Sequence, residues 1–190
     1  GNTLRCFAVS GAHQGEGLLA DLLSHLIVVQ FQRGYTHLFL YTKTDSAKFF
    51  ARLGFYEIAR VSDTLVFMEN RRSGFSDYLS KLAIYGDDRH HSAIVMNANP
   101  FTLGHQYLVE KAASENDLVH LFIVSEDASL VPSAVRRKLV VEGTSHLTNI
   151  CYHDCGPYMI SNATFPSYFQ KDENAVIRSH AMLDLSVFAQ

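Results

Sequence analysis

Thr102 and His105 are the two side chains in this sequence whose types and spacing best suit phosphate chemistry. They follow a short apolar run, residues 94–96, and a loop rich in Asn and Pro. Residues three apart in the first turn of a helix face the same way, so a hydroxyl and an imidazole would meet one ligand. That turn also presents unpaired backbone N–H groups and the positive end of the helix dipole. The pattern predicts a site that holds a nucleotide triphosphate while its α-phosphate is attacked.

The loop contributes five further residues to the predicted nucleotide site: Asn97, Asn99, Pro100, Phe101 and Gly104. The asparagines tolerate turn geometry and donate amide hydrogen bonds, and the proline fixes the backbone ahead of the helix. Gly104 lets a phosphate approach where a side chain would block it. His105 can donate a hydrogen bond to a phosphate oxygen as charge builds up on it. The alternative is a plain strand–helix junction capped by Thr102, which would leave Gly104 and His105 without a role.

Strands that alternate with helices are expected to position this loop. Three strands are predicted at residues 93–96, 119–124 and 149–153, with helices at 103–115, 132–142 and within 172–189. Such alternation favours a parallel sheet with right-handed crossovers. An earlier α/β unit is predicted from strands at 4–10, 36–42, 55–60 and 64–68 and helices at 18–32 and 45–53. The expected organisation is therefore a first domain over 1–70, a connecting helix and linker over 71–91, and a second domain over 92–190.

The composition is that of an ordinary globular protein and excludes several classes. Hydrophobic residues make up 47% of the 190 residues and charged residues 18%. A net charge of −3 gives no basic footprint for nucleic acid. No apolar run approaches the roughly 18 residues that a membrane span needs. The chain begins without Met and without a signal segment, so we expect a cytoplasmic protein whose sequence starts inside a longer one.

Three cysteines, an odd number, do not suggest a disulfide framework. Cys151, His153 and Cys155 could be imagined as a metal clip. However, the segment follows a strand pattern, no second Cys/His pair has matching spacing, and a structural zinc site takes four ligands. The sequence is therefore interpreted as a strand, and no protein-bound metal site is predicted.

Residues 102–105, Thr-Leu-Gly-His, resemble the TxGH variant of the HxGH motif of nucleotidyltransferases. Together with residues 95–101, 121–127 and 156–169, they also resemble the citrate lyase ligase family. The resemblance implies an enzyme that uses ATP and acetate to acetylate the prosthetic-group thiol on the acyl carrier subunit of citrate lyase. Acetyl-adenylate would be the intermediate, and AMP and pyrophosphate the products. His105 and Thr102 would serve the first step, with Mg²⁺ on the phosphates of ATP.

Five residues outside the loop are weaker candidates for nucleotide or substrate binding. Ser125 lies beyond the carboxyl end of a predicted strand, where ligands bind in open sheets. By resemblance Arg136 could reach phosphate, although a solvated helix face would explain it equally well. Lys171 could contact phosphate or carboxylate, or be a surface lysine. Ser161 and Thr164 could orient a substrate, or only form a turn.

Residues 13–19 resemble the acyl-CoA pyrophosphate loop of GNAT acetyltransferases, through Gln14, Gly15 and Gly17. Leu19 departs from the small residue expected there, and the glycines could merely shape a loop. Residues 46–55 resemble the late GNAT helix and its Leu-Gly-Phe turn. The expected fold class is α/β: a partial GNAT-like domain followed by a Rossmann-like nucleotidyltransferase domain. Both look truncated, because one strand precedes the first loop and no later Ser- and Arg-containing nucleotide motif follows Asp172.

Three other functions stay open at the level of sequence. The first is an adenylyltransferase that acts on a phosphopantetheine-like or mononucleotide substrate through the same Thr102–His105 site. The second is a CoA-dependent acetyltransferase. The third is a binding role, in which the GNAT-like part docks the acyl carrier or its pantetheine arm.

Overall fold

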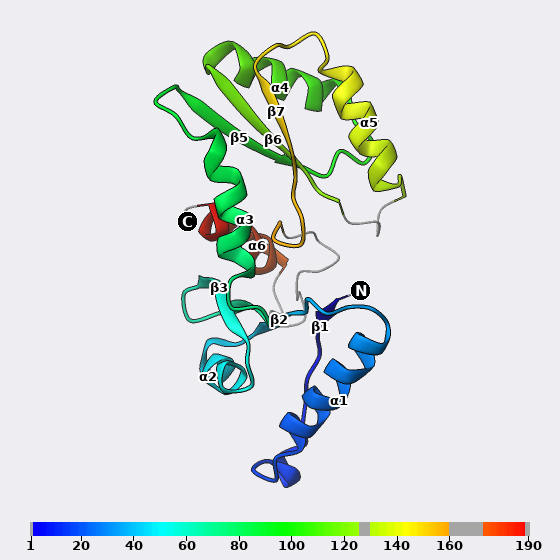
Figure 1. The fold of residues 1–190 in the computed structure, drawn as a ribbon, viewed down its shortest axis with the longest axis vertical. Coiled ribbons are helices and arrows are strands. Elements are labelled where there is room, and N and C mark those ends of the chain that lie inside the picture. The colour runs from blue at the N-terminus through cyan, green and yellow to red at the C-terminus, as the bar shows by residue number, and fades with distance from the viewer. Residues whose placement is uncertain (1, 126–129, 160–172, 189–190) are drawn as a thin grey trace. The chain divides into compact units, whose positions relative to one another are not determined.

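The computed structural model describes residues 2–125, 130–159 and 173–188, and these form two compact units (Figure 1). One unit comprises residues 2–84 together with helix α6 (Glu173–Phe188). The other comprises residues 85–159. Within the described residues, none of the helices has the length and apolarity that crossing a membrane requires.

The first unit is built on a four-stranded sheet with the order β1-β2-β4-β3. Its strands are β1 (Thr3–Leu4), β2 (Phe39–Thr42), β3 (Tyr56–Val61) and β4 (Leu65–Glu69). β1 runs parallel to β2, whereas β4 is antiparallel to both β2 and β3. The helices are η1 (Gly11–His13), α1 (Leu18–Gln32), α2 (Thr44–Arg52) and α3 (Gly74–Leu82). The first strand is shorter than the predicted 4–10, since Cys6 adopts a positive φ of 62° that interrupts an extended chain.

The core of this unit lies between the sheet and two helices. Leu23 of α1 and Phe50 of α2 are buried against Leu40 of β2 and Met68 of β4. Helix α6 belongs here too, because it contacts β3. Its Ser186 Oγ lies 3.3 Å from the carbonyl oxygen of a β3 residue. By its contacts this helix therefore belongs to the first unit, whereas the sequence analysis grouped it with residues 92–190.

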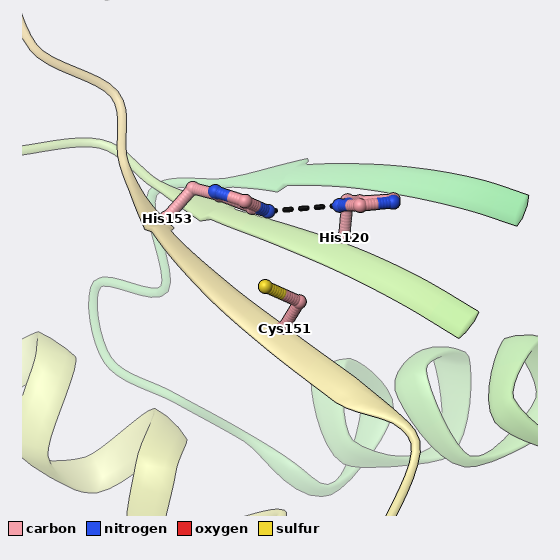
Figure 2. A group of neighbouring side chains, drawn as sticks. All are labelled: His120, Cys151 and His153. Atoms are coloured by element: carbon pink, nitrogen blue, oxygen red, sulfur yellow. Dashed lines mark hydrogen bonds between the residues drawn. The ribbon is translucent and has the colours of Figure 1, made fainter. Parts of the chain in front are cut away.

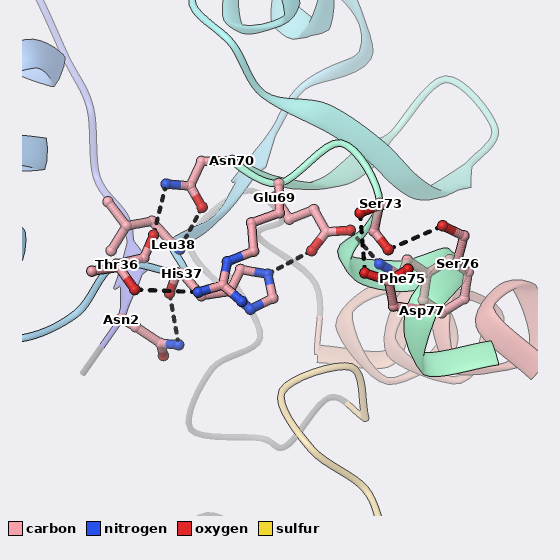
Figure 3. Close-up of polar contacts among 11 residues, drawn as sticks. Asn2, Thr36, His37, Leu38, Glu69, Asn70, Ser73, Phe75, Ser76 and Asp77 are labelled. Carbon is pink, nitrogen blue, oxygen red and sulfur yellow. Dashed lines mark hydrogen bonds and ion pairs between the residues drawn. The ribbon is translucent and has the colours of Figure 1, made fainter. Parts of the chain in front are cut away.

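A buried carboxylate ties the ends of three elements together in this unit (Figure 3). Glu69, at the end of β4, is only 2% exposed. Its Oε1 accepts a 2.7 Å hydrogen bond from the backbone N–H of Phe75 in the first turn of α3, where such donors lack helical partners. Its Oε2 lies 2.5 Å from Nε2 of His37, just before β2. These two hydrogen bonds give the buried Glu69 a structural role.

The second unit contains a fully parallel, three-stranded sheet with the order β5-β6-β7. A short helix, η2 (Ala83–Tyr85), precedes it. The strands are β5 (His91–Met96), β6 (Leu118–Ile123) and β7 (Ile150–Asp154), connected through α4 (Leu103–Glu115) and α5 (Ser133–Gly143). Alternating strands and helices with parallel pairing make this a Rossmann-like α/β unit, as the sequence predicted.

The two faces of this sheet differ in chemistry. Successive strand residues point to opposite faces. Ile94, Leu121 and Ile123 lie on one face and form a core with Val109 of α4 and Val140 of α5. The opposite face carries four chemistry-bearing side chains: His91, His120, Cys151 and His153. We call these four residues and their surface the histidine face.

Candidate nucleotide site

The predicted loop connects the carboxyl end of β5 to the first turn of α4. β5 ends at Met96 and α4 begins at Leu103, so residues 97–102 lie at the sheet edge where ligands bind in open α/β folds. Ala98 has a positive φ of 49°, and the bond between Asn99 and Pro100 is cis. Thr102 is the N-cap of α4, in an extended conformation.

Thr102 and His105 form a reciprocal capping box. The backbone N–H of Thr102 donates to Nδ1 of His105 at 3.2 Å, and Thr102 Oγ1 lies 2.8 Å from the same nitrogen. A backbone N–H can only donate, so in the neutral imidazole Nδ1 is the acceptor and Nε2 carries the proton. The half-buried His105 therefore offers its Nε2–H as a donor to an anion.

Gly104 is not required by the packing of the protein itself. A Cβ built on this residue would come no closer than 3.7 Å to another atom, Oγ1 of Thr102, which is an ordinary contact. Gly143 of α5 is the opposite case, since its Cβ would lie 2.5 Å from the Phe101 ring. The half-buried Phe101 thus fills space over α5, and packing explains its position, whereas packing does not explain Gly104.

Arg136 is fully buried, which excludes the alternative of a solvated helix face. Its Nη1 donates to the carbonyl oxygens of Asn97 and Val124 at 2.6 and 2.7 Å, and to Oδ1 of Asn97 at 2.7 Å. Its Nε donates to the carbonyl oxygen of Val131 at 3.0 Å. The guanidinium connects the ends of β5 and β6 to the start of α5. It therefore helps to position the loop of residues 97–102. Its contact with phosphate stays a prediction.

Among the predicted nucleotide-site residues at this edge, the exposed ones are Asn97, Asn99, Pro100, Thr102, Gly104 and Ser125. Asn99 Oδ1 accepts a hydrogen bond from the backbone N–H of Val131 at 3.1 Å, which joins the loop to the segment before α5.

A small cavity of about 130 Å³ opens at the same edge, where the ends of β6 and β7 meet the start of α5. Ser125, Ser133 and Arg137 are among its lining residues. Nη1 of Arg137 lies 3.2 Å from Oδ1 of Asp154. Ser133 and Arg137 were not predicted as site residues from the sequence. The expected helix over 132–142, which follows a predicted strand, could have indicated them, since the first turn of such a helix lies at the carboxyl edge of the sheet.

Comparison with known proteins identifies the family. The family model described as the citrate lyase ligase C-terminal domain matches residues 91–190, which is more than half of the chain. The chain belongs to the citrate lyase ligase family. This confirms the resemblance seen in the loop and in the later sequence blocks.

Three curated members of the family, each named citrate (pro-3S)-lyase ligase, are similar along the chain. The protein of Klebsiella pneumoniae is 44% identical over 100% of this chain and 56% of its own length. That of Escherichia coli (strain K12) is 40% identical over 100% of this chain and 54% of its own. That of Haemophilus influenzae (strain ATCC 51907 / DSM 11121 / KW20 / Rd) is 38% identical over 99% of this chain and 56% of its own length. The chain therefore spans about half the length of the curated relatives it matches.

Part of the family-like sequence lies outside the described residues. Ser161, Thr164 and Lys171 all fall within residues 160–172, so their roles stay predictions.

The GNAT-like loop borders a cavity of about 470 Å³ at the start of α1. Gln14, Gly15, Gly17 and Leu19 all line it. Gly15 and Gly17 have φ values of 92° and 80°, a conformation that glycine adopts readily, so backbone shape explains both. Leu19, the departure from the GNAT pattern, contributes to the lining of this cavity.

The histidine face has its own electrostatics. Burial lowers the pKa of His120, and the nearby His91 lowers it further. Burial, followed by the effect of His120, lowers the pKa of His153. Burial raises the pKa of the Cys151 thiol. All three groups therefore favour their uncharged forms.

Proposed function

We propose that this chain carries the ATP-activating site of an AMP-forming acid–thiol ligase. The enzyme acetylates the prosthetic-group thiol on the acyl carrier subunit of citrate lyase, and releases AMP and pyrophosphate. The observation that carries this proposal is the Thr102–His105 capping box, which directs an imidazole N–H at the start of α4 in a member of this family. Because the reaction consumes ATP, we place it in the cytoplasm.

The first step forms acetyl-adenylate. An acetate oxygen attacks the α-phosphorus of ATP, the bond from that phosphorus to the bridging oxygen breaks, and pyrophosphate leaves. Nε2–H of His105 and the backbone donors of the α4 first turn stabilise the charge on the phosphate oxygens. Little covalent chemistry is asked of the protein, so positioning and charge stabilisation dominate.

We propose that Mg²⁺ is bound to the phosphates of ATP before the nucleotide binds the protein. Residues 97–105 contain no Asp or Glu, so the loop suits an anion and offers the ion no carboxylate. Mg²⁺ keeps several waters and is often bound through substrate phosphates, where it neutralises charge. We therefore treat MgATP as the substrate.

The second step transfers the acetyl group. The thiol sulfur attacks the acyl carbon, the bond from that carbon to the AMP oxygen breaks, and the thiol proton is released. We propose that the first unit docks the pantetheine-like arm of the carrier, because a cavity of about 470 Å³ lies at its GNAT-like loop. A CoA-dependent acetyltransferase is the alternative for this unit, and turnover of acetyl-CoA without ATP would support it.

Pyrophosphate exchange tests the proposed function against a plain adenylyltransferase. The intact protein is incubated with ATP and radiolabelled pyrophosphate, with and without acetate. We expect exchange of label into ATP only when acetate is present, since acetate is the attacking group. Exchange that is indifferent to acetate would favour an adenylyltransferase and contradict the ligase.

A further inference from the structure

The register of β6 and β7 brings two imidazoles and a thiol together on the histidine face (Figure 2). His120 pairs directly with Cys151, and His153 follows Cys151 by two residues on the same face. One nitrogen of each imidazole and the sulfur of Cys151 all lie within 4.8 Å of one another. The sequence analysis rejected a metal site at Cys151 and His153, because it could not show that His120, about thirty residues earlier in the chain, lies beside them.

The possible ligand atoms of this group lie close to one another. Nδ1 of His120 and Nε2 of His153 face each other at 2.8 Å. In a tetrahedral zinc site, bond lengths imply nitrogens about 3.3 Å apart and a sulfur about 3.6 Å from each nitrogen. Side-chain shifts on the order of 1 Å would therefore place all three atoms at ligand distances.

The outer contacts of His120 match those of a metal-bound histidine. Its Nε2 lies 2.8 Å from Nδ1 of His91, whose Nε2 lies 2.8 Å from Oδ1 of Asp87. If Nδ1 of His120 binds an ion, its Nε2–H donates to His91, and His91 in turn donates to the carboxylate. Metal-bound histidines almost always donate their second N–H in this way, which fixes the tautomer and the ring orientation.

Aromatic rings hold His153 in place while the group stays accessible. The ring of Phe122 stacks on His153 at 4.7 Å, and that of Tyr85 meets it edge-on at 5.0 Å. His153 is 6% exposed, whereas His120 and Cys151 are half-buried. An ion can therefore reach the group from the side of His120 and Cys151.

We propose that His120, Cys151 and His153 bind a divalent ion of the zinc class, with His91 and Asp87 as outer-sphere partners. Two imidazoles and a thiolate suit zinc and do not suit Mg²⁺ or Ca²⁺, which prefer oxygen ligands. Three protein ligands leave a fourth tetrahedral position for water or another donor. The thiol of Cys151 loses its proton to solvent as its sulfur binds the ion.

Metal titration of the intact protein tests this site. After removal of metal with a chelator, Zn²⁺ binding is measured by equilibrium dialysis, and Co²⁺ is used as a spectroscopic probe. We expect one ion per chain and a thiolate-to-cobalt charge-transfer absorption. Cys151→Ser should abolish that absorption and weaken Zn²⁺ binding at least about tenfold. The matched control is Cys6→Ser, which removes an exposed thiol of the other unit and should change neither.

His91→Phe separates an ion site from a hydrogen-bonded group of histidines. It should weaken Zn²⁺ binding by roughly ten- to a hundredfold and keep the charge-transfer absorption, since the ligands remain. Circular dichroism verifies that each variant is folded, and the near-isosteric Cys151→Ser decides the matter if His91→Phe does not fold. Failure of the chelated protein to bind Zn²⁺, or binding unaffected by Cys151→Ser, would overturn the proposal.

Discussion

His105 is oriented by a backbone donor from its own helix cap. The N–H of Thr102 fixes Nδ1 as an acceptor, and the Thr102 hydroxyl reinforces that contact. The proton of the neutral ring is thereby held on Nε2, the nitrogen proposed to meet the phosphate. Thr102 thus caps α4 and directs its neighbour at the same time.

Replacing Thr102 by Val tests this double role. The variant loses the cap, at a cost of about 1 kcal/mol in the free energy of unfolding. It also loosens His105, so acetate-dependent pyrophosphate exchange should fall by roughly ten- to a hundredfold. Thr102→Ser keeps the hydroxyl and is expected to retain most of the exchange. Equal exchange rates in the valine variant and the native protein would show that the hydroxyl does not orient the ring.

The relative placement of Thr102, Gly104 and His105 could be predicted from the sequence, because they are neighbours along the chain. Their relative placement depends only on a strand end followed by a helix, and local patterns carry that information. The surroundings of Arg136 were different, since its acceptors on Asn97 and Val124 come from two other strand ends. Neither helical spacing nor residue type could indicate that the side chain is buried.

At the scale of elements, Arg136 holds the ends of β5 and β6 to the start of α5. Arg136→Met would leave the carbonyl oxygens of Asn97, Val124 and Val131 without this donor. We expect the free energy of unfolding to fall by about 2–4 kcal/mol, measured by denaturant titration.

The matched control for that variant is Lys138→Met, two residues along the same helix, where the side chain is 72% exposed. This variant should lie within about 0.5 kcal/mol of the native protein. Similar losses in the two variants would mean that the Arg136 hydrogen bonds contribute no special stability.

Most helices and strands could be predicted, because apolar residues recur with a period of two in strands and about 3.6 in helices. The helix expected at 103–115 is α4, Leu103–Glu115, and the strands of the parallel sheet lie within one or two residues of their predicted positions. The strand expected at 4–10 was too long because a single positive φ at Cys6 leaves no mark in an apolar pattern. The histidine face could not be predicted, because its residues come from three strands whose register is not determined by local sequence.

At the scale of the molecule, the chain forms two units and spans about half the length of its curated relatives. The family model covers residues 91–190, yet α6 packs against β3 in the first unit. The expected division at residue 92 therefore stays a prediction about evolutionary domains. Tertiary contacts place α6 in the first unit, whereas the family model includes it with residues 91–190. Local sequence patterns could not predict these long-range contacts.

Filling the cavity at the GNAT-like loop tests the role proposed for the first unit. Leu18→Trp adds a bulky ring to a residue that lines the cavity. We expect acetyl transfer to the carrier to slow by about tenfold, equivalent to about 1.4 kcal/mol of lost binding, with a much smaller effect on pyrophosphate exchange. Val28→Trp, at a 53% exposed position of the same helix, should leave both steps unchanged. Equal losses in both steps for Leu18→Trp would count against a docking role.

The loop that ends in His105 is proposed to activate ATP, and acetate-dependent pyrophosphate exchange by the His105→Ala variant tests that role. Loss of a transition-state donor should lower the exchange rate by roughly two or more orders of magnitude, with the fold verified by circular dichroism. His90→Ala, which alters an exposed histidine just before β5, is the control and should exchange at the native rate. An exchange rate for His105→Ala close to that of the native protein would contradict the assignment.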